Sequence, residues 1–176
     1  MIEFKLDGME AIPKIYAAVP GELEPHEIDD FVAFVLTGGE VDPNDLRDRV
    51  TRAHYIAFLR EKGCLLGVGG LKQPSENHRN EVSVGSKTKI IAQDFPFELG
   101  WVFILPSARG RKLSFPLCQP LVTAAKGRGI FATSRVDNGS MYATLGKLGF
   151  IRTGVEWPSK QNNGNLALFV KHGGTN

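Results

Sequence analysis

The stretch ELGWVFILPSARGRKLS, residues 98–114, carries the most structural information in this chain. Apolar residues dominate its first half, which predicts a strand over residues 97–105 that stops at Pro106. A loop with Arg109, Arg111 and Lys112 follows, and we expect a helix from about residue 111 to residue 125. Unpaired N–H groups at a helix start, the helix dipole and three cations together favour an anion, and a diphosphate uses more of these donors than a carboxylate. The alternative is a basic loop that only water contacts.

The rest of the chain alternates between strands and helices. The pattern upstream predicts a strand at residues 2–6, helices at 11–19, 25–36 and 42–53, and a hairpin of strands at 55–60 and 64–73. Residues 74–96 are polar and weakly patterned. Downstream we expect a strand at 130–135, a helix at 140–148 and strands at 151–157 and 165–171. Strand–helix–strand order implies parallel neighbours and hairpins imply antiparallel ones, so a single α/β domain over residues 1–176 with a mixed sheet is predicted.

Composition excludes several classes of protein. Among 176 residues, 42% are hydrophobic, and no apolar run approaches the roughly 20 residues of a membrane span. The N-terminus carries acids where a signal peptide needs a basic start and an apolar block. Cys64 and Cys118 are too few for a disulfide framework and fit no zinc spacing, and the four histidines lie far apart. We therefore expect a cytoplasmic globular protein without a metal and without a membrane partner.

Charge is distributed unevenly along the chain. The net charge is −6 over residues 1–98 and +8 over residues 99–176. This asymmetry suggests that the C-terminal half faces an anion, although chance segregation screened by salt explains it equally well. Aromatic residues do not interleave with the basic ones, which argues against a nucleic-acid partner.

Several residues follow one another in a specific order and spacing: Glu98, Pro106, Arg109-Gly110, Asn138 and Leu148-Gly149-Phe150. They resemble the signature of the GNAT superfamily, the acyl-CoA-dependent N-acetyltransferases. In that family a Glu opens the fourth strand, a glycine-rich loop wraps the coenzyme A pyrophosphate, and an Asn ends the next strand. The resemblance covers residues 97–171 and is weak upstream. It implies a mixed sheet of about six to seven strands, mostly antiparallel, with a splayed parallel pair at its centre and helices on both faces.

The resemblance also implies a reaction and a set of binding residues. An acetyl group would pass from acetyl-CoA, the co-substrate, to a primary amine of a small molecule or protein by direct attack. The pantetheine arm would pair with the backbone of Val102, Phe103 and Ile104, and a backbone N–H near Phe103 would stabilise the developing negative charge. The pyrophosphate would lie on a loop formed by Arg109, Gly110, Arg111, Lys112, Leu113 and Ser114. Asn138 would contact the coenzyme, cap the next helix, or do both.

Two side chains are candidates for proton transfer. The resemblance implies that Glu98 takes the proton from the amine. Strand alternation places it on an apolar stripe with Gly100, Val102 and Ile104, which would raise its pKa towards that of a useful base; the alternative is a carboxylate in solvent or paired with Arg. Where the family often has a Tyr as general acid, this chain has Leu145, so Tyr142, one helical turn earlier, is the candidate acid, with core packing as its alternative.

The chain departs from the family pattern at two loop positions. Lys112 stands where the family usually has a glycine, and Ser114 where it has Gly or Ala. Because Lys adopts positive φ at a higher cost than Gly, a less tightly wound loop is expected. Pro120 should kink the helix that contains it or delay its start.

Two rival functions remain open at this stage. One is a catalytically idle domain that binds acyl-CoA, which the altered loop and the missing Tyr support. The other is an acetyltransferase for an amine on a nucleic acid. The acceptor itself carries no recognisable motif, and a homodimer is compatible with the sequence.

Overall fold

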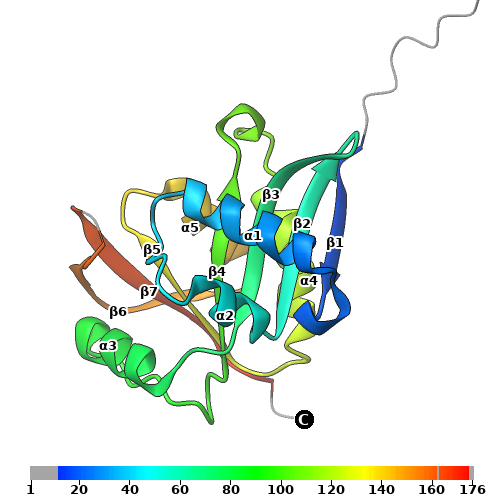
Figure 1. The fold of residues 1–176 in the computed structure, drawn as a ribbon. Helices are drawn as coiled ribbons and strands as arrows, with labels where there is room; N and C mark the ends of the chain where they lie inside the picture. The colour runs from blue at the N-terminus through cyan, green and yellow to red at the C-terminus, as the bar shows by residue number, and fades with distance from the viewer. Residues whose placement is uncertain (1–11, 162, 175–176) are drawn as a thin grey trace, which may run out of the picture.

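Seven strands form one mixed sheet in the order β1-β2-β3-β4-β5-β7-β6 (Figure 1). The computed structural model describes residues 12–161 and 163–174. Neighbouring strands are antiparallel except β4 and β5, which are parallel. The strands are β1 (Lys14–Ala18), β2 (Tyr55–Glu61), β3 (Cys64–Lys72), β4 (Phe97–Ile104), β5 (Ile130–Arg135), β6 (Ile151–Pro158) and β7 (Asn165–Lys171). The prediction of a mixed sheet with a central parallel pair is confirmed.

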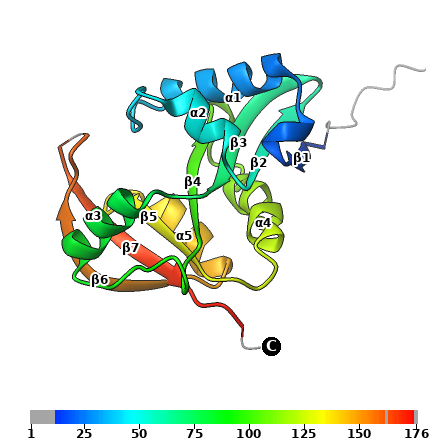
Figure 2. The ribbon, with the colours of Figure 1, turned by 60° about the horizontal axis from the view of Figure 1, so that its bottom comes forward.

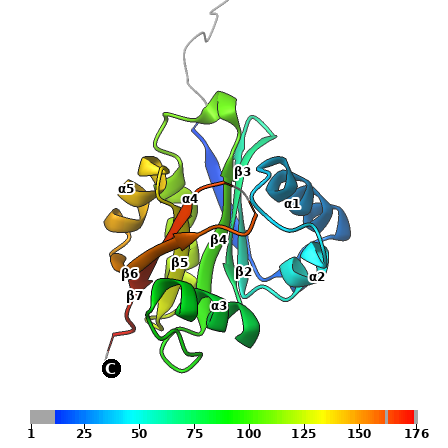
Figure 3. The ribbon, with the colours of Figure 1, turned by 90° about the vertical axis from the view of Figure 1, so that its left-hand side faces the viewer.

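Helices cover both faces of this sheet, as predicted. We call the face under α1, α2 and α3 the front face and the face under α4 and α5 the back face (Figures 2 and 3). The helices are α1 (Pro25–Thr37), α2 (Leu46–Thr51), α3 (Glu76–Ser86), α4 (Ser114–Ala124) and α5 (Gly139–Lys147), with 3-10 turns η1 (Pro20–Glu22) and η2 (Pro106–Ala108). None of the helices in the described ranges is long and apolar enough to cross a bilayer.

The apolar core is continuous on the back face and divided on the front face. On the back face, Leu117 and Leu121 of α4 and Leu145 of α5 pack against the sheet. On the front face, one cluster lies under α1 and α2, with Phe31, Phe58 and Trp101 as its aromatic members. A second cluster lies under α3, with Val82, Phe95 and Phe131 among its members. The surface of β4 between these two front clusters is where the polar groups described below gather.

The prediction of a helix over residues 11–19 is wrong, because Lys14–Ala18 form strand β1. The exposure of Lys14–Ala18 alternates with period two, and the strand pairs with β2 as an edge of the sheet. The apolar residues of this segment are spaced as on one face of a helix, which led to the wrong prediction, whereas pairing with β2 determines the local structure. The strand expected at residues 2–6 lies outside the described residues.

Helix α3 was not predicted within the weakly patterned residues 74–96. Its first turn is capped by the Ser75 hydroxyl, which accepts from the backbone N–H of His78. Its buried side chains, chiefly Val82 and Arg79, are few, so no apolar period stands out in the sequence. Elsewhere, the hairpin turn at Lys62-Gly63 is confirmed, and Pro120 lies inside α4 without delaying its start.

A β-bulge interrupts β4 in its middle. Two residues, Trp101 and Val102, lie opposite the single Gly69 of β3, and Trp101 has a φ of +53°. The alternation of side chains therefore shifts by one residue at Trp101. The predicted stripe of Glu98, Gly100, Val102 and Ile104 is wrong for this reason: Val102 and Ile104 pack with the back-face cluster, while Trp101 and Phe103 pack on the front face.

Candidate functional site

The parallel strands β4 and β5 separate soon after they meet. Their residue pairs are Phe97 with Ile130 and Glu98 with Phe131, and no later pair joins them. β5 continues to Arg135 in contact with β7, while β4 continues to Ile104 in contact with β3. Within the described structure, β4 beyond Glu98 therefore has a neighbouring strand on one side only. Its main-chain groups on the other side can pair with an extended ligand.

The loop after β4 forms the start of helix α4 at the open end of this separation. Gly110 and Lys112 have φ values of +80° and +59°. Lys112 thus adopts the left-handed conformation itself, so the expectation of a looser loop is wrong at this residue. No hydrogen bond to another described residue uses the backbone N–H groups of Gly110, Lys112, Leu113, Ser114 or Phe115, and Leu113 caps the helix without a side-chain bond. Such a row of N–H groups at a helix start is suited to bind an anion.

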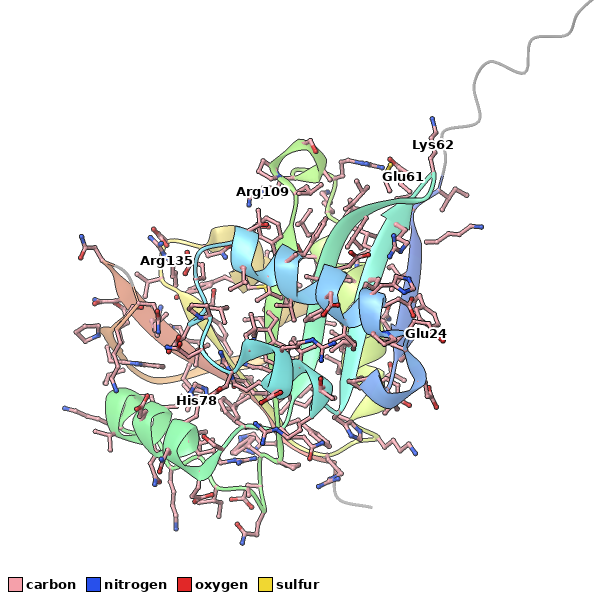
Figure 4. All side chains as sticks on the ribbon, in the orientation of Figure 1. Glu24, Glu61, Lys62, His78, Arg109 and Arg135 are labelled. Atoms are coloured by element: carbon pink, nitrogen blue, oxygen red, sulfur yellow. The ribbon has the colours of Figure 1, made fainter. Side chains whose placement is uncertain are left out.

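The three cations of the loop lie in different environments. The Nε of Arg109 donates to the carbonyl oxygen of Ile104 at 3.0 Å, and its guanidinium lies 5.7 Å from the centre of the Phe103 ring. Arg111 pairs with Glu61 at the tip of the β2–β3 hairpin, with Nη2 2.6 Å from Oε1. Lys112 is exposed. Figure 4 shows that Arg109 and Glu61 lie at the same end of the sheet.

Asn138 and Tyr142 come from helix α5. Asn138 accepts from the backbone N–H of Met141 at 3.0 Å, so it caps this helix, as one of its two predicted roles requires. Tyr142 packs edge-to-face against Phe169 of β7, with ring centres 4.7 Å apart, and its buried hydroxyl has no hydrogen-bond partner among the described residues. The structure thus places Tyr142 in the back-face core and away from Glu98; its role as an acid stays a prediction.

Glu98 is buried on the front face beside the side chains of Lys72 and His78. It is 3% exposed, and its Oε2 lies 2.9 Å from Lys72 Nζ and 3.0 Å from His78 Nε2. Burial alone would raise the pKa of this carboxyl, but the charges of Lys72 and His78 and their hydrogen bonds outweigh burial and lower the pKa from its ordinary 4.5 to about 2. The prediction that the pKa of Glu98 is raised is therefore wrong. The bulge turns Val102 and Ile104 to the back face, and Lys72 and His78 lie beside Glu98 instead of an apolar stripe.

Strand register brings Lys72 to Glu98, and the position of helix α3 brings His78 to it. Lys72 lies directly opposite Glu98 in the β3–β4 register, and its chain runs over Gly100, where a Cβ would lie 2.7 Å from Lys72 Cε. His78 belongs to the first turn of α3, and its ring stacks on Phe131, the β5 residue that pairs with Glu98. The three polar side chains thus meet where β4 and β5 begin to separate. In the sequence they are widely spaced, and only the register of β3 against β4 could have indicated Lys72.

The predicted site residues fall into two groups. The backbone of residues 102–104, the loop of residues 109–114 and Asn138 lie towards one end of the parallel pair, because both strands run in the same direction. Glu98 lies nearer the other end, on the front face. In the described part of the chain, no group of three or more His, Cys, Asp or Glu side chains could hold a metal ion.

Neither family models nor the sequences of curated proteins match the chain. Solved structures do match it over nearly its whole length. A GNAT-family acetyltransferase from Streptococcus agalactiae has a TM-score of 0.62 at 18% identity, covering 92% of this chain and 96% of its own. An N-acetyltransferase from Staphylococcus aureus has a TM-score of 0.65 at 18% identity, covering 92% and 99%. The protein yncA from Salmonella typhimurium, solved with its cofactor acetyl-CoA, has a TM-score of 0.63 at 14% identity, covering 94% and 96%. The fold of this chain is therefore the fold of the GNAT-family acetyltransferases.

Proposed function

We propose that this protein transfers an acetyl group from acetyl-CoA to a primary amine of a small molecule or protein. The observation that carries the proposal is the separation of β4 from β5 ahead of a loop in which the N–H groups of Gly110 and of residues 112–115 have no partner among the described residues. An extended arm that ends in a diphosphate matches this combination in shape and in charge. The solved structures of the same fold support the choice of acyl chemistry, since one of them holds acetyl-CoA.

The chain's own residues fit each part of this co-substrate. The backbone of β4 from Val102 to Ile104 offers N–H and C=O groups to the amide-containing arm. The N–H groups of Gly110, Lys112, Leu113, Ser114 and Phe115 suit the diphosphate, and the positive end of the α4 dipole adds to their attraction. Arg109 and Lys112 can each add a charge-assisted hydrogen bond. When bound, the thioester supplies an activated acyl group, and a β4 N–H near Phe103 would stabilise negative charge on its carbonyl oxygen.

Calorimetry tests the binding half of this proposal. Coenzyme A should bind, and Arg109→Ala or Lys112→Ala should each weaken binding by about 1.5–3 kcal/mol, because each removes a charge-assisted bond to phosphate. Lys126→Ala is the matched control: Lys126 also has positive φ, but it follows the opposite end of α4. Unchanged affinity in both loop variants would remove the argument for a phosphate site here.

Release of free thiol tests the catalytic half. Incubation with acetyl-CoA and a panel of primary amines should release coenzyme A at a rate that depends on the amine. Mass spectrometry of products formed in a cell extract should then identify the acceptor class as small molecule or protein.

The idle acyl-CoA-binding domain is the second candidate, and one observation favours it. With a pKa of about 2, Glu98 is a poor proton acceptor at neutral pH. This candidate predicts coenzyme binding in the calorimeter without thiol release towards any amine in the panel.

A further inference from the structure

His78 is the most exposed member of the polar group on the front face. Its side chain is 40% exposed, against 19% for Lys72 and 3% for Glu98, and both Lys72 and His78 contact the same oxygen, Oε2, of Glu98. Of the three side chains, His78 therefore offers the largest exposed fraction to a molecule that approaches from solvent.

We propose that His78 takes the proton from the acceptor amine and that Glu98 positions His78 for this step. The inference rests on the proposed acetyl transfer and deepens it, because it assigns the proton acceptor to a helix that sequence patterning had missed. It changes the role of Glu98 from catalytic base to positioning residue.

The geometry of the pair determines which ring nitrogen can act. The buried Nε2 of His78 lies 3.0 Å from Oε2 of Glu98, although the ring is not aligned for a straight hydrogen bond. Because an ionised carboxylate offers only electron pairs, a nitrogen at this distance has to carry the hydrogen. In the neutral ring the free electron pair then resides on Nδ1. Once Nδ1 takes a proton, the buried carboxylate stabilises the resulting imidazolium.

The surroundings of the ring allow this role. Glu98 faces it from β4, Lys72 reaches the same carboxylate from β3, and the apolar ring of Phe131 on β5 stacks on it with centres 6.3 Å apart. On α3 itself, the charged neighbour Arg79 turns away from the ring and donates to the carbonyl oxygens of Pro74 and Pro96. His78 thus shares the carboxylate with one cation, Lys72, and no second carboxylate forms an ion pair with it in the described structure.

The proton balance of the step is simple. The amine arrives as an ammonium ion and gives one proton to His78 Nδ1. Its nitrogen then forms a bond to the acyl carbon, the carbon–sulfur bond breaks, and the electron pair leaves with sulfur. Of the two protons that the nitrogen loses in total, one ends on the thiol and the other is released to solvent.

A purely structural role is the competing explanation, since the His78–Glu98 contact also holds α3 on the sheet. The variant His78→Gln separates the two roles, because the Gln amide can still donate to Glu98 but cannot accept a proton near neutral pH. His26→Gln is the matched control, as His26 is an exposed histidine in the first turn of α1.

Two measurements test the proposal. In the first, kcat/KM for the amine should fall about 10²–10⁴-fold in His78→Gln near neutral pH, with coenzyme affinity unchanged within about twofold. The defect should shrink as pH rises, because more of the amine arrives already neutral. A loss that is equal at every pH, or no loss, would show that His78 is structural.

The second measurement uses the protein without coenzyme or amine. Nitrogen NMR of the protein labelled at histidine should show the neutral His78 ring with its hydrogen on Nε2. A hydrogen on Nδ1 overturns the proposed geometry even in an active enzyme. A wild-type protein that binds coenzyme A and transfers acetyl to no amine overturns the proposed function itself, whatever the tautomer.

Discussion

At the scale of single residues, Glu98 combines features that are costly to hold together. A carboxylate that is 3% exposed loses its hydration, and this loss is offset here by Lys72 and His78, whose side-chain nitrogens lie 2.9 Å and 3.0 Å from it. Both partners keep part of their surface in water, so the group as a whole is only partly desolvated. The net result is a carboxyl group that stays ionised well below neutral pH.

The lowered pKa of Glu98 predicts a specific acid sensitivity. Because the pKa is about 2 in the folded protein and about 4.5 unfolded, its stabilisation is fully present above pH 4.5 and is lost as pH falls from 4.5 towards 2. The shift corresponds to about 3 kcal/mol of unfolding free energy. Urea unfolding at a series of pH values should show this loss in the wild type.

The variant Glu98→Gln provides the control for this prediction. It should be less stable than the wild type at neutral pH by about 2–4 kcal/mol, because Lys72 loses its counter-charge and His78 loses its carboxylate partner. Its stability should change much less between pH 4.5 and pH 2. Identical acid profiles for the two proteins would mean that other carboxylates dominate the loss.

A substitution at Lys112 tests the effect of its backbone conformation on stability and the effect of its charge on binding. A φ of +59° destabilises the folded state of a non-glycine residue by about 1–2 kcal/mol. Glycine avoids this cost, but it loses more backbone entropy on folding, which offsets part of the gain. Lys112→Gly should therefore raise the unfolding free energy by about 0.5–1 kcal/mol while it weakens coenzyme A binding. Thermal unfolding and calorimetry on the same sample check both effects; greater stability combined with unchanged affinity would remove Lys112 from the phosphate site.

At the scale of elements, the bulge in β4 depends on a glycine in the neighbouring strand. A Cβ at Gly70 would lie 2.6 Å from Cε3 of Trp101, an atom of a rigid and nearly buried ring. Gly70→Ala should therefore displace Trp101 and destabilise the protein by about 1–3 kcal/mol. Intrinsic fluorescence in a Trp157→Phe background reports the displacement directly.

A glycine with free space around it serves as the comparison for Gly70. Gly146 in α5 has nothing within 4 Å of the position of a Cβ, so Gly146→Ala should stabilise the protein by about 0.5–1 kcal/mol. If both substitutions have the same effect, contact with Trp101 is not what selects glycine at position 70.

The sequence correctly predicted those helices and strands that have a clear apolar pattern of their own. The hairpin of β2 and β3, strand β4, strand β5 and the last two strands were predicted to within a few residues, because each has an apolar run bounded by turn residues. Strand β1 was mistaken for a helix, because an edge strand is decided by its partner. Lys72 and His78 escaped notice because register and tertiary packing alone bring them to Glu98.

At the scale of the whole molecule, ion pairs neutralise part of the positive charge of the C-terminal half. Arg111, Arg135 and Arg152 of the basic C-terminal half each form an ion pair with a carboxylate. The remaining positive field includes Arg109 and Lys112 at the start of α4. The positive charge of the C-terminal half is not confined to this end of the sheet, because Lys126 and Arg128 follow the opposite end of α4.

This arrangement predicts a salt dependence that follows the phosphates of the ligand. Raising salt from about 50 mM to about 500 mM should weaken coenzyme A binding by roughly tenfold, because screening acts on exposed charges. Acetyl-pantetheine, which keeps the arm and lacks the nucleotide phosphates, should show little change. Equal sensitivity of the two ligands in calorimetry would contradict a charged loop as the main anchor.

The separation of β4 from β5 also bears on folding. Beyond Glu98, β4 has a row of main-chain groups in the middle of the sheet that no other strand satisfies in the described structure. An extended ligand would complete that row, so binding would act as the last step of assembly. Stability would then rise with the logarithm of ligand concentration. The heat resistance of this protein in a cell would accordingly follow the size of the pool of free ligand.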